Sequence, residues 1–510
     1  MRITNKIMQR NNLSNLNTNK VYQDRLSTQM STQKKVNRPS DDPVVAIRAL
    51  RLRSSVTEIT QYYSKNIPDA ESWLNVTEDA LKNLSQILTK MIEQCTKGSN
   101  GDLKDADRQI ILEQLKALGD EVYTTGDADY AGRYVFTGYR TDTSLSFTKA
   151  TKQPYEITEQ IDRNAFDSVT KVNSGNLLDW SEANYDTLTD ADEQAVDVVE
   201  VHRLRLAYND CSADYKPTIT YKDANGDEQT LTSTTVHSYE EPSPYEQAAN
   251  DPDAIIYVPE TGEILLGDNV YNQLMSVKDD TSTVENEGEI RVTYQKSNWQ
   301  KGDLRPEHYF YCKSDPGADE EIEYNASFLT GNVEKQAIEY DVGFNQTIRI
   351  NSTADECFQH GIGREVDDLI NALQEVVDLQ KVKDKIEKKL ETASGADAEL
   401  LKKQLAGVDK ALTFAKDKTQ KLFEGGITSF QGYLDSANLC ITNCGSRSSK
   451  LELIENRMQN QKTTFETLKS ENEDIDITEI VIQLTSAELT YEAALMATGK
   501  VTQTTLLNFI

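Results

Sequence analysis

Apolar residues recur in a heptad pattern, at alternating steps of three and four, through residues 475–510 of the sequence. Burying the eight seam positions of this stripe would return about 1–2 kcal/mol each, whereas ordering its backbone costs about 1–2 kcal/mol per residue. Such a helix is unstable alone, so the stripe predicts a surface for a partner; the alternative is a terminal helix docked on its own domain. The seam comprises Ile477, Ile480, Leu484, Ala487, Tyr491, Ala494, Thr498 and Val501, which Val481 and Leu495 widen and Leu506 follows.

The first 30 residues carry a weaker apolar pattern among Asn, Gln, Ser and Thr, without proline or glycine. A signal peptide needs an unbroken apolar core of roughly 7–15 residues, which this polar segment lacks. We therefore expect a chain that is either cytosolic or exported by a route that uses no cleavable signal. The apolar members are Ile3, Ile7, Met8, Leu13, Leu16, Val21, Leu26 and Met30.

Charge and hydropathy exclude several classes of protein. The 54 Lys and Arg against 84 Asp and Glu give a net charge of -30, which argues against nucleic acid and anionic membranes as main partners, because both bind cationic side chains. The mean hydropathy is -0.61, and no stretch approaches the roughly 18 apolar residues of a membrane span, so no membrane insertion is expected. The length of 510 residues allows about two to four domains, and we expect a soluble, elongated chain.

The six cysteines are scattered and do not form the disulfide framework of a small secreted domain. On a helix, Cys440 and Cys444 would share a face, where they could bind a metal or form a cross-link. No third ligand follows nearby, and cysteine is an ordinary buried helix residue. Buried packing is therefore the favoured interpretation, and no metal or cofactor is expected. The other four are Cys95, Cys211, Cys312 and Cys357.

Prolines at positions 39 and 43 separate the first helix from a second, longer one. Asp42 before Pro43 is a helix-start signal, because a carboxylate caps free N–H groups and proline suits the first helical position. Pro68 interrupts the heptad seam that follows and predicts a kink or a new helix start. That seam comprises Val56, Ile59, Tyr63, Asn66, Ala70, Trp73, Thr77, Ala80, Leu84, Ile87 and Met91, widened by Leu74, Leu81 and Leu88.

A break at residues 98–102 precedes another amphipathic helix, predicted over 103–122. Residues 130–139, Tyr-Ala-Gly-Arg-Tyr-Val-Phe-Thr-Gly-Tyr, predict an aromatic β-hairpin arm. Aromatic rings at this density could form a base-stacking platform. The chain is acidic and the arm poor in arginine, so ordinary packing is the stronger interpretation.

Four short motifs, in the same order along the chain, resemble the flagellin superfamily. They are a Met-Arg-Ile-Thr start, Arg-Pro-Ser-Asp-Asp-Pro at 38–43, Gly-Arg-Tyr-Val-Phe-Thr-Gly at 132–138, and an end that runs from Glu-Asp-Ile-Asp at 473–476 to two leucines at 506–507. The turn and the arm are more similar to the hook-associated protein 3 family of the hook–filament junction than to filament flagellin. These two motifs are carried by Ser40, Asp41, Asp42, Pro43, Arg133, Tyr134, Phe136 and Gly138.

The resemblance covers about residues 1–140 and 430–510. It implies a mainly α fold with a β-rich insertion, in which both chain ends build a long helical coiled-coil bundle. The parts expected are terminal helices of an inner tube at 1–40 and 472–510, a helical core domain with the arm at 41–140 and 430–471, a β-rich outer insertion at 141–355, and a helical segment with a Lys/Glu-rich hairpin at 361–429.

The residue patterns beyond the motifs agree with this architecture. Short β-branched and aromatic runs at 218–221, 255–258, 290–294 and 347–350 predict strands. Asp223, Asn225 and Asp227 mimic the start of a calcium loop, but the glycine is misplaced and no Glu stands at loop position twelve, so a hairpin turn is favoured. Gly445 predicts a break before a separate helix at 447–471. The apolar face of that helix comprises Leu451, Ile454, Met458, Phe465 and Leu468.

The sequence lacks the motifs of common enzymes, namely the His-Glu-x-x-His helix, the Gly-x-Ser-x-Gly elbow, the P-loop and the dinucleotide fingerprint. The prediction is a non-enzymatic structural subunit of the bacterial flagellum, secreted by type III export and placed at the hook–filament junction. Its expected partners are copies of itself in a ring, the adjoining hook-associated protein and flagellin subunits, and an export chaperone. Filament flagellin, a coiled-coil scaffold and a flagellin-like protein with an enzymatic insertion are the alternatives.

Assembly is predicted to couple to folding, because terminal segments that are unstable alone become helical when neighbours bury them. The residues predicted to form this assembly interface are Ile3, Ile7, Leu13 and Leu16 at one end, and Ile477, Ile480, Val481, Leu484, Tyr491, Leu495, Val501 and Leu506 at the other.

Overall fold

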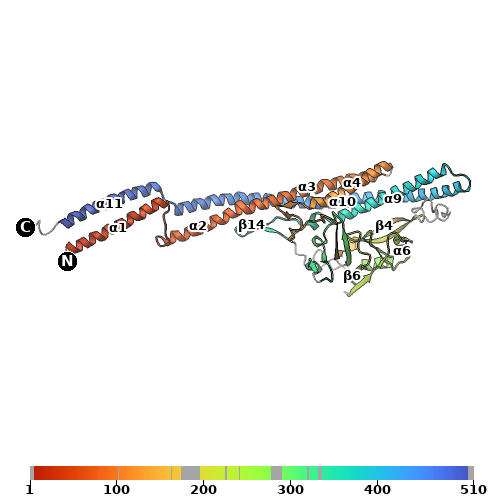
Figure 1. Cartoon of the computed structure of the whole chain (residues 1–510), viewed down its shortest axis with the longest axis horizontal. Coiled ribbons are helices and arrows are strands. Elements are labelled where there is room, and N and C mark those ends of the chain that lie inside the picture. The colour runs from red at the N-terminus through yellow and green to blue at the C-terminus, as the bar shows by residue number, and fades with distance from the viewer. Residues whose placement is uncertain are drawn as a thin grey trace, which may run out of the picture. The chain divides into compact units, whose positions relative to one another are not determined.

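The computed structural model describes residues 5–100, 103–161, 163–173, 196–223, 227–240, 242–276, 290–318, 321–330 and 336–503. Long helices and several β-sheets form the fold, in agreement with the predicted mainly α class with a β-rich insertion (Figure 1). Contacts divide the chain into two compact units, each built from distant parts of the sequence. The first comprises Met1–Glu71, Tyr340–Ile348 and Ser449–Ile510, and the second Ser72–Glu339 and Arg349–Ser448. The finer division by residue made from the sequence stays a prediction.

The first unit is mainly helical. It contains α1 (Asn5–Thr32), α2 (Pro43–Gln61), the π-helix η1 (Tyr62–Asn66) and α11 (Ile477–Gln503), with parts of α3 (Ile67–Gly98) and α10 (Ala396–Glu473). A β-ribbon formed by β14 (Glu339–Gly343) and β15 (Gln346–Arg349) contributes most of its residues to the same unit. The ribbon is held there by the Asn66 side chain, which donates to the Asp341 carbonyl at 2.8 Å, and by edge-to-face packing of Phe344 on Tyr62.

The predicted helix start at Asp42 is confirmed. One carboxylate oxygen of Asp42 accepts hydrogen bonds from the backbone N–H groups of Val44 and Val45, at 3.0 and 3.1 Å, and Pro43 occupies the first helical position. The turn before it closes on itself, because the Arg38 backbone N–H donates to the Asp41 carboxylate at 3.0 Å. This explains locally why α1 and α2 are separate helices.

At Pro68 the sequence predicted a kink or a new helix start, but no new helix begins there, because the backbone stays helical from α2 through η1 into α3. Proline has no N–H to donate, and the helix before it widens into the π-helix η1, where the Ile67 N–H donates to the Tyr62 carbonyl five residues earlier. Beyond this point α3 carries the heptad seam into the core. The widening positions Leu74, Leu81 and Leu88 are each 0% exposed, as the heptad pattern predicts.

The predicted helix break at Gly445 is wrong. α10 continues through this position for 78 residues, and a Cβ placed on Gly445 would meet no atom within 4 Å. A glycine inside a helix costs only about 1 kcal/mol relative to alanine, which flanking buried residues such as Cys444 and Leu451 offset by packing. Residues 447–471 are therefore the end of a long helix and not a separate one.

The Lys/Glu-rich helical hairpin is formed by α9 (Gly361–Leu390) and the start of α10. Gly395, with φ of +71°, lies in the turn between them, a backbone conformation that glycine adopts without strain. The hairpin encloses a hydrophobic core, to which Val172 of β4 (Phe166–Asn173) and Val196 also contribute, so it is less solvent-exposed than its charges suggest. This core includes Val376, Leu379, Val382, Ile386, Leu401, Val408, Ala411, Leu412 and Ala415.

The other helices of the second unit are short or lie beside α9. α4 (Asp105–Gly126) packs along α9, where the Tyr123 hydroxyl accepts a hydrogen bond from the Gly363 N–H at 2.8 Å. The short elements are α6 (Pro244–Asn250), α7 (Asp268–Met275), α8 (Ala354–Cys357), and the 3-10 turns η2 (Arg163–Ala165), η5 (Pro306–His308) and η6 (Ala326–Thr330).

The two larger β-sheets lie between α4 and α9 in sequence. One has the strand order β4-β5-β10-β9-β8 and the other β13-β12-β3-β11-β6-β7. The predicted runs at 218–221, 255–258, 290–294 and 347–350 fall in β6, β9, β11 and β15. The strands are β3 (Thr151–Ile161), β4 (Phe166–Asn173), β5 (Asp197–Arg205), β6 (Thr218–Lys222), β7 (Glu228–Thr232), β8 (Thr234–Thr235), β9 (Ile255–Val258), β10 (Glu263–Leu266), β11 (Ile290–Trp299), β12 (Tyr311–Ser314) and β13 (Ile322–Tyr324).

The predicted hairpin after β6 is confirmed. β6 and β7 pair antiparallel, with Lys222 opposite Glu228, and the Asp223 N–H donates to the Asp227 carbonyl at 3.0 Å. Asn225, at the turn itself, lies outside the described residues.

A buried charge cluster joins the first of these sheets to α9. Arg203 on β5 is 4% exposed and binds Asp167 of β4 and Glu263 of β10, both at 2.6 Å, and Asp368 of α9 at 3.0 Å. Arg205 adds a second bond to Asp368 at 2.7 Å. These carboxylates balance the guanidinium charges, which could not be buried alone.

Candidate assembly surface on the terminal helices

α1 and α11 lie side by side in the first unit (Figure 1). The side of α11 that is turned inward follows the heptad seam predicted from the sequence. Ala487 at its centre is 8% exposed. The half-buried positions on the same side are Ile480, Leu484, Tyr491, Ala494 and Thr498.

The inward side of α1 is polar. Leu16 and Leu26 are buried, at 8% and 2% exposure, but the positions between and before them carry amide side chains. These half-buried amides are Gln9, Asn12, Asn19 and Gln23. The two helices therefore meet along an asymmetric seam, apolar on α11 and largely polar on α1, which buries little hydrophobic area for its length.

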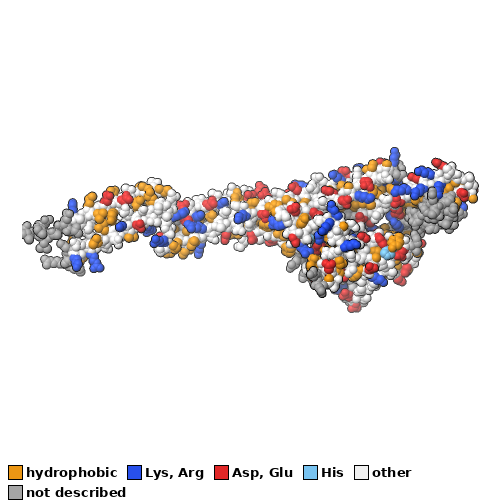
Figure 2. Space-filling model, viewed as in Figure 1, with side chains coloured by type: hydrophobic (Ala, Val, Ile, Leu, Met, Phe, Trp, Pro, Cys, Tyr) orange, Lys and Arg blue, Asp and Glu red, His pale blue; other side chains and the backbone are white. Residues whose placement is uncertain are grey.

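Several of the predicted interface residues are exposed, and hydrophobic side chains lie on the surface of the terminal helices (Figure 2). Ile7 and Leu13 on α1 are 49% and 62% exposed, and Ile477, Val481 and Leu495 on α11 are 51%, 40% and 46% exposed. The side chain of Val501, like Ile3 and Leu506, lies outside the part of the chain whose side chains are described. The structure thus places the predicted residues in two groups, one within the α1–α11 seam and one on the outside of the pair.

The outer side of α11 also carries apolar residues that the sequence analysis missed. Ile482, Leu489 and Met496 are 65%, 63% and 71% exposed and recur every seven residues. This spacing places them above one another on one face of the helix, opposite Ala487. The seven-residue spacing of these three apolar residues is visible in the sequence and could have predicted a second apolar face. We call these three residues the outer apolar surface, together with the exposed residues Ile7, Leu13, Ile477, Val481 and Leu495.

A hollow of about 300 Å³ lies between α1 and α11, bordered by one residue of this surface, Ile482. Tyr22 of α1 and Ile482 of α11 line it, together with Asn19, Gln483, Ser486, Ala487 and Thr490. It is large enough for an apolar side chain of a neighbouring molecule.

The break between α1 and α2 lies against the break between α10 and α11, and together they form a tight elbow. The sequence did not predict this elbow. Lys34 and Asp474 form an isolated antiparallel bridge, the Lys35 N–H donates to the Glu473 carbonyl at 2.7 Å, and the Ile475 N–H donates to the Gln33 carbonyl at 3.3 Å. The break between α1 and α2 is therefore tied directly to the break between α10 and α11.

Charge pairs reinforce the elbow. The Arg53 guanidinium of α2 donates two hydrogen bonds of 2.7 Å to the Glu473 carboxylate, which is 4% exposed, and Lys34 pairs with both Asp474 and Glu473. The hydrogen bond from Arg53 lowers the pKa of Glu473, and that from Lys34 lowers the pKa of Asp474. The elbow is thus held in its ionised form at neutral pH.

The arm motif is a hairpin with a structural role. β1 (Asp129–Tyr130) and β2 (Arg133–Tyr134) pair across a two-residue turn in which Ala131 and Gly132 have φ of +53° and +78°. Arg133 lies over the rings of Trp73 and Tyr130, at 5.0 and 5.6 Å.

The rest of the arm docks on the segment before α9. Phe136 is 1% exposed and packs on Phe358, with 4.8 Å between ring centroids, while its carbonyl accepts from the Ala354 N–H at 2.9 Å. Gly138, with φ of +62°, lies so close to the Gln336 side chain that a Cβ would clash with it. These contacts agree with ordinary packing of the aromatics.

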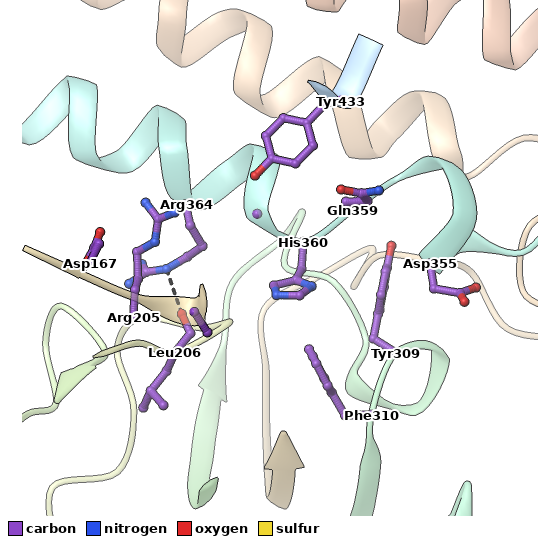
Figure 3. A pocket seen from close by; sticks show the side chains of 12 residues that line it. Asp167, Arg205, Leu206, Tyr309, Phe310, Asp355, Gln359, His360, Arg364 and Tyr433 are labelled. Atoms are coloured by element: carbon purple, nitrogen blue, oxygen red, sulfur yellow. Dashed lines mark hydrogen bonds between the residues drawn. The ribbon is translucent and has the colours of Figure 1, made fainter. Parts of the chain in front are cut away.

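A pocket of about 420 Å³ lies in the second unit, at the start of α9 (Figure 3). Tyr309, Phe310, His360 and Tyr433 contribute rings to its wall, and Arg205 and Arg364 contribute guanidinium groups. The polar atoms of the two arginines are engaged within the protein: Arg364 donates to the Leu206 carbonyl at 3.0 Å and Arg205 to Glu365 at 3.0 Å.

His360 in this pocket is a weak base. Burial, with the positive charges of Arg205 and Arg364, lowers its pKa to about 4. Within the described ranges, no group of three or more His, Cys, Asp or Glu could hold a metal ion. In the same part of the chain, no helix is both long and apolar enough to cross a membrane.

Comparison with known proteins finds a family model and several relatives, each similar to a part of this chain. Residues 3–141 match the family model of the bacterial flagellin N-terminal helical region. Flagellar hook-associated protein 3 of Salmonella typhimurium is 29% identical over 167 residues, which cover 32% of this chain and 52% of that protein. The protein of the same name from Escherichia coli is 29% identical over 145 residues, or 28% and 45% of the two chains.

A filament protein is also similar. Flagellin of Clostridium tyrobutyricum is 27% identical over 122 residues, covering 24% of this chain and 32% of that protein. The chain thus spans about half the length, or less, of the curated relatives it matches. The resemblance of residues 3–141 to the bacterial flagellin N-terminal helical region, and of the chain to hook-associated protein 3, is confirmed.

Proposed function

We propose that this chain is a structural subunit of the bacterial flagellum that joins hook to filament. The observation that carries the proposal is the 29% identity to two proteins named flagellar hook-associated protein 3. The pairing of both chain ends in one helical unit supports it, because such a unit can contact neighbours along its whole length. The subunit acts by binding its neighbours and needs no catalytic group.

Two sets of residues share the work of assembly in this proposal. One set holds α1 and α11 together within one subunit, and it comprises the seam residues Ile480, Leu484 and Tyr491 with Leu16 on α1. The outer apolar surface contacts adjacent subunits, because large apolar side chains that stay exposed in a monomer are typical of interfaces. Ile3, Val501 and Leu506 extend the interface toward the chain ends.

Folding and assembly are coupled in this mechanism. The α1–α11 seam is polar on one side, so the pair gains little from burial in the monomer and becomes fully ordered only when neighbours cover the outer apolar surface. The same marginal stability suits a chain that is threaded through the flagellar type III export apparatus with an export chaperone. A ring of copies, flanked by another hook-associated protein and by flagellin, is the expected assembly.

The experiment that tests this function is immunogold electron microscopy of intact flagella, with an antibody raised against the β-rich part at residues 145–350. One compact band where hook meets filament is the expected result. The same antibody on flagella from cells that lack the gene is the control for specificity. Absence of label on wild-type flagella would overturn the proposal.

Filament flagellin is the second candidate function, and the similarity to the flagellin of Clostridium tyrobutyricum favours it. The two candidates differ in copy number and in position. Label along the whole filament would identify a flagellin, whereas a single band would exclude it.

A further inference from the structure

Two cysteines that are distant in sequence meet in the second unit. Cys357 ends α8 and Cys440 lies in the middle of α10. Both are buried, at 1% and 6% exposure. The sequence suggested Cys440 and Cys444 as a pair, but Cys444 points to a different neighbour, since its thiol lies 3.4 Å from the Leu74 carbonyl on α3.

The thiols of Cys357 and Cys440 lie in the same buried region. The Cys440 thiol donates to the carbonyl oxygen of Glu356, the residue next to Cys357, at 3.4 Å, and each of the two thiols shifts the pKa of the other. Other contacts fix the backbone on both sides. Arg349 pairs with the Glu356 carboxylate at 3.3 Å, and Arg447 of α10 donates to the Asn351 carbonyl at 2.8 Å.

Cys440 is also the cysteine best placed to react. The hydrogen bond from Cys357, aided by the charge of Arg447, lowers the pKa of Cys440. Burial instead raises the pKa of Cys95 and Cys211 to about 12 and that of Cys444 to about 11. A thiolate next to a second thiol is the arrangement from which protein disulfides form.

We propose that Cys357 and Cys440 are a redox-active dithiol that closes to a disulfide between α8 and α10. With oxidised glutathione as the oxidant, the Cys440 thiolate attacks one sulfur and releases one glutathione thiolate. The Cys357 thiolate then attacks the Cys440 sulfur of the mixed disulfide and releases the second. Two protein thiols are oxidised, and one glutathione disulfide is reduced to two glutathione molecules.

Where the oxidation takes place rests on the proposed function, because export would carry the chain from the reducing cytosol to an oxidising exterior. The bond would close a loop that contains all of α9 and the start of α10. It would also fix the segment on which the arm docks through Phe136 and Phe358. The disulfide is thus expected to raise the temperature of unfolding of the second unit.

The test uses the purified full-length protein and oxidised glutathione. After incubation, free thiols are blocked, and the protein is digested with trypsin without reduction and studied by mass spectrometry. The expected result is a cross-link between the peptides 350–364 and 422–447, with loss of two of the six titratable thiols. Because the pair is buried, a second sample is unfolded in urea and refolded in a glutathione redox buffer, which removes the barrier of access.

Three serine variants identify the bond. Cys444→Ser should keep the cross-link and Cys440→Ser and Cys357→Ser should each lose it, while circular dichroism checks that every variant folds. A cross-link through Cys444, or a refolded wild type that retains six free thiols, would overturn the proposal. The outcome is independent of where the protein sits in the cell, so it is not affected by failure of the immunogold experiment.

Discussion

Arg203 shows how one side chain can hold distant parts of the chain together. Its guanidinium binds carboxylates from two strands of the five-stranded sheet and from α9, and it is almost fully buried. Burial opposes its charge, but the hydrogen bond to Asp167 and the negative charges of Asp368 and Glu263 raise its pKa well above the ordinary value. The cluster is therefore stable only as a complete set of partners.

Arg203→Ala is expected to destabilise the protein by about 3–5 kcal/mol, because it leaves Glu263 buried without its counter-charge and Asp368 paired with Arg205 alone. Urea denaturation followed by circular dichroism measures the change. The control is Lys381→Ala, which removes an exposed pair with Asp378 and should change stability by less than about 0.5 kcal/mol. Equal effects of the two variants would contradict the assigned role of the cluster.

The elbow at Glu473 should depend on pH. Its pKa, like that of Asp474, is lowered from ordinary values of 4.5 and 3.8 by the partners in the folded state. The contribution of both groups to stability is therefore complete above their ordinary values and is lost as pH falls through the lowered ones.

Hydrogen exchange of α1 and α11, corrected for the intrinsic effect of pH, should show protection that falls below about pH 4. Glu473→Gln should reduce protection at neutral pH and flatten this dependence. Protection of the variant that still follows the wild-type pH profile would show that other groups cause the change.

Among the helices, α10 shows where local rules of sequence fail. Gly445 was predicted to end a helix because glycine has a poor helix propensity, yet packing on both sides of it prevails. At Asp42 the prediction succeeded because the deciding interaction, a side-chain cap, is made within one turn, whereas at Pro68 the helix widens into η1 and does not begin anew. Signals that act over one turn can be read from sequence, whereas a helix of this length depends on distant neighbours.

Gly445→Ala is expected to stabilise the protein by about 0.5–1 kcal/mol, since the position is helical and a Cβ meets open space. The matched opposite is Gly98→Ala, where a Cβ would lie 2.5 Å from the Phe423 ring and must displace it. Thermal unfolding of the two variants should shift in opposite directions. A loss of stability in Gly445→Ala would mean that α10 does need flexibility at this point.

α11 presents two apolar sides, of which the heptad pattern revealed one. Its inward side packs on α1 in the monomer, and its outer side carries Ile482, Leu489 and Met496 in the open. The sequence predicted that the helix would need a partner, and the structure supplies α1 for one side only.

The variant Leu489→Asp tests the outer side of α11 without changing the side that packs on α1. Leu489 is 63% exposed, so the helicity and unfolding temperature of the monomer should stay unchanged, while assembly on flagella should be lost because a charge would enter the interface. Leu439→Asp is the matched control, since that residue of α10 is also 63% exposed. Normal incorporation of the Leu489 variant into flagella would remove α11 from the proposed interface.

For the molecule as a whole, charge limits how copies can approach. Each chain carries a net charge of -30, and salt screens such charges over about 8–10 Å at ordinary ionic strength. Assembly in vitro should therefore accelerate as sodium chloride is raised from low concentration, which light scattering can follow. A rate that is independent of salt would indicate that the charged faces point away from neighbouring subunits.

The sequence predicted the broad architecture of the molecule but few of its long-range contacts. The fold class, the terminal helices, the arm and the helical hairpin all follow from periodicity, turn residues and motifs. The contacts of Arg203, the elbow at Lys34 and Glu473, and the meeting of Cys357 with Cys440 join residues that are hundreds or tens of positions apart. Nothing in local composition specifies which distant residue becomes a partner, so these could be found only in the structure.

The amide-rich side of α1 has a consequence for the alignment of the chain ends. Gln9, Asn12, Asn19 and Gln23 can exchange hydrogen bonds with many partners, so they select no single alignment of α1 against α11. A slip by one heptad would move one helix about 10 Å along the other and would still leave amides opposite apolar residues. The elbow fixes the register instead, because the backbone pairing of Lys34 with Asp474 sets the positions at which α1 ends and α11 begins.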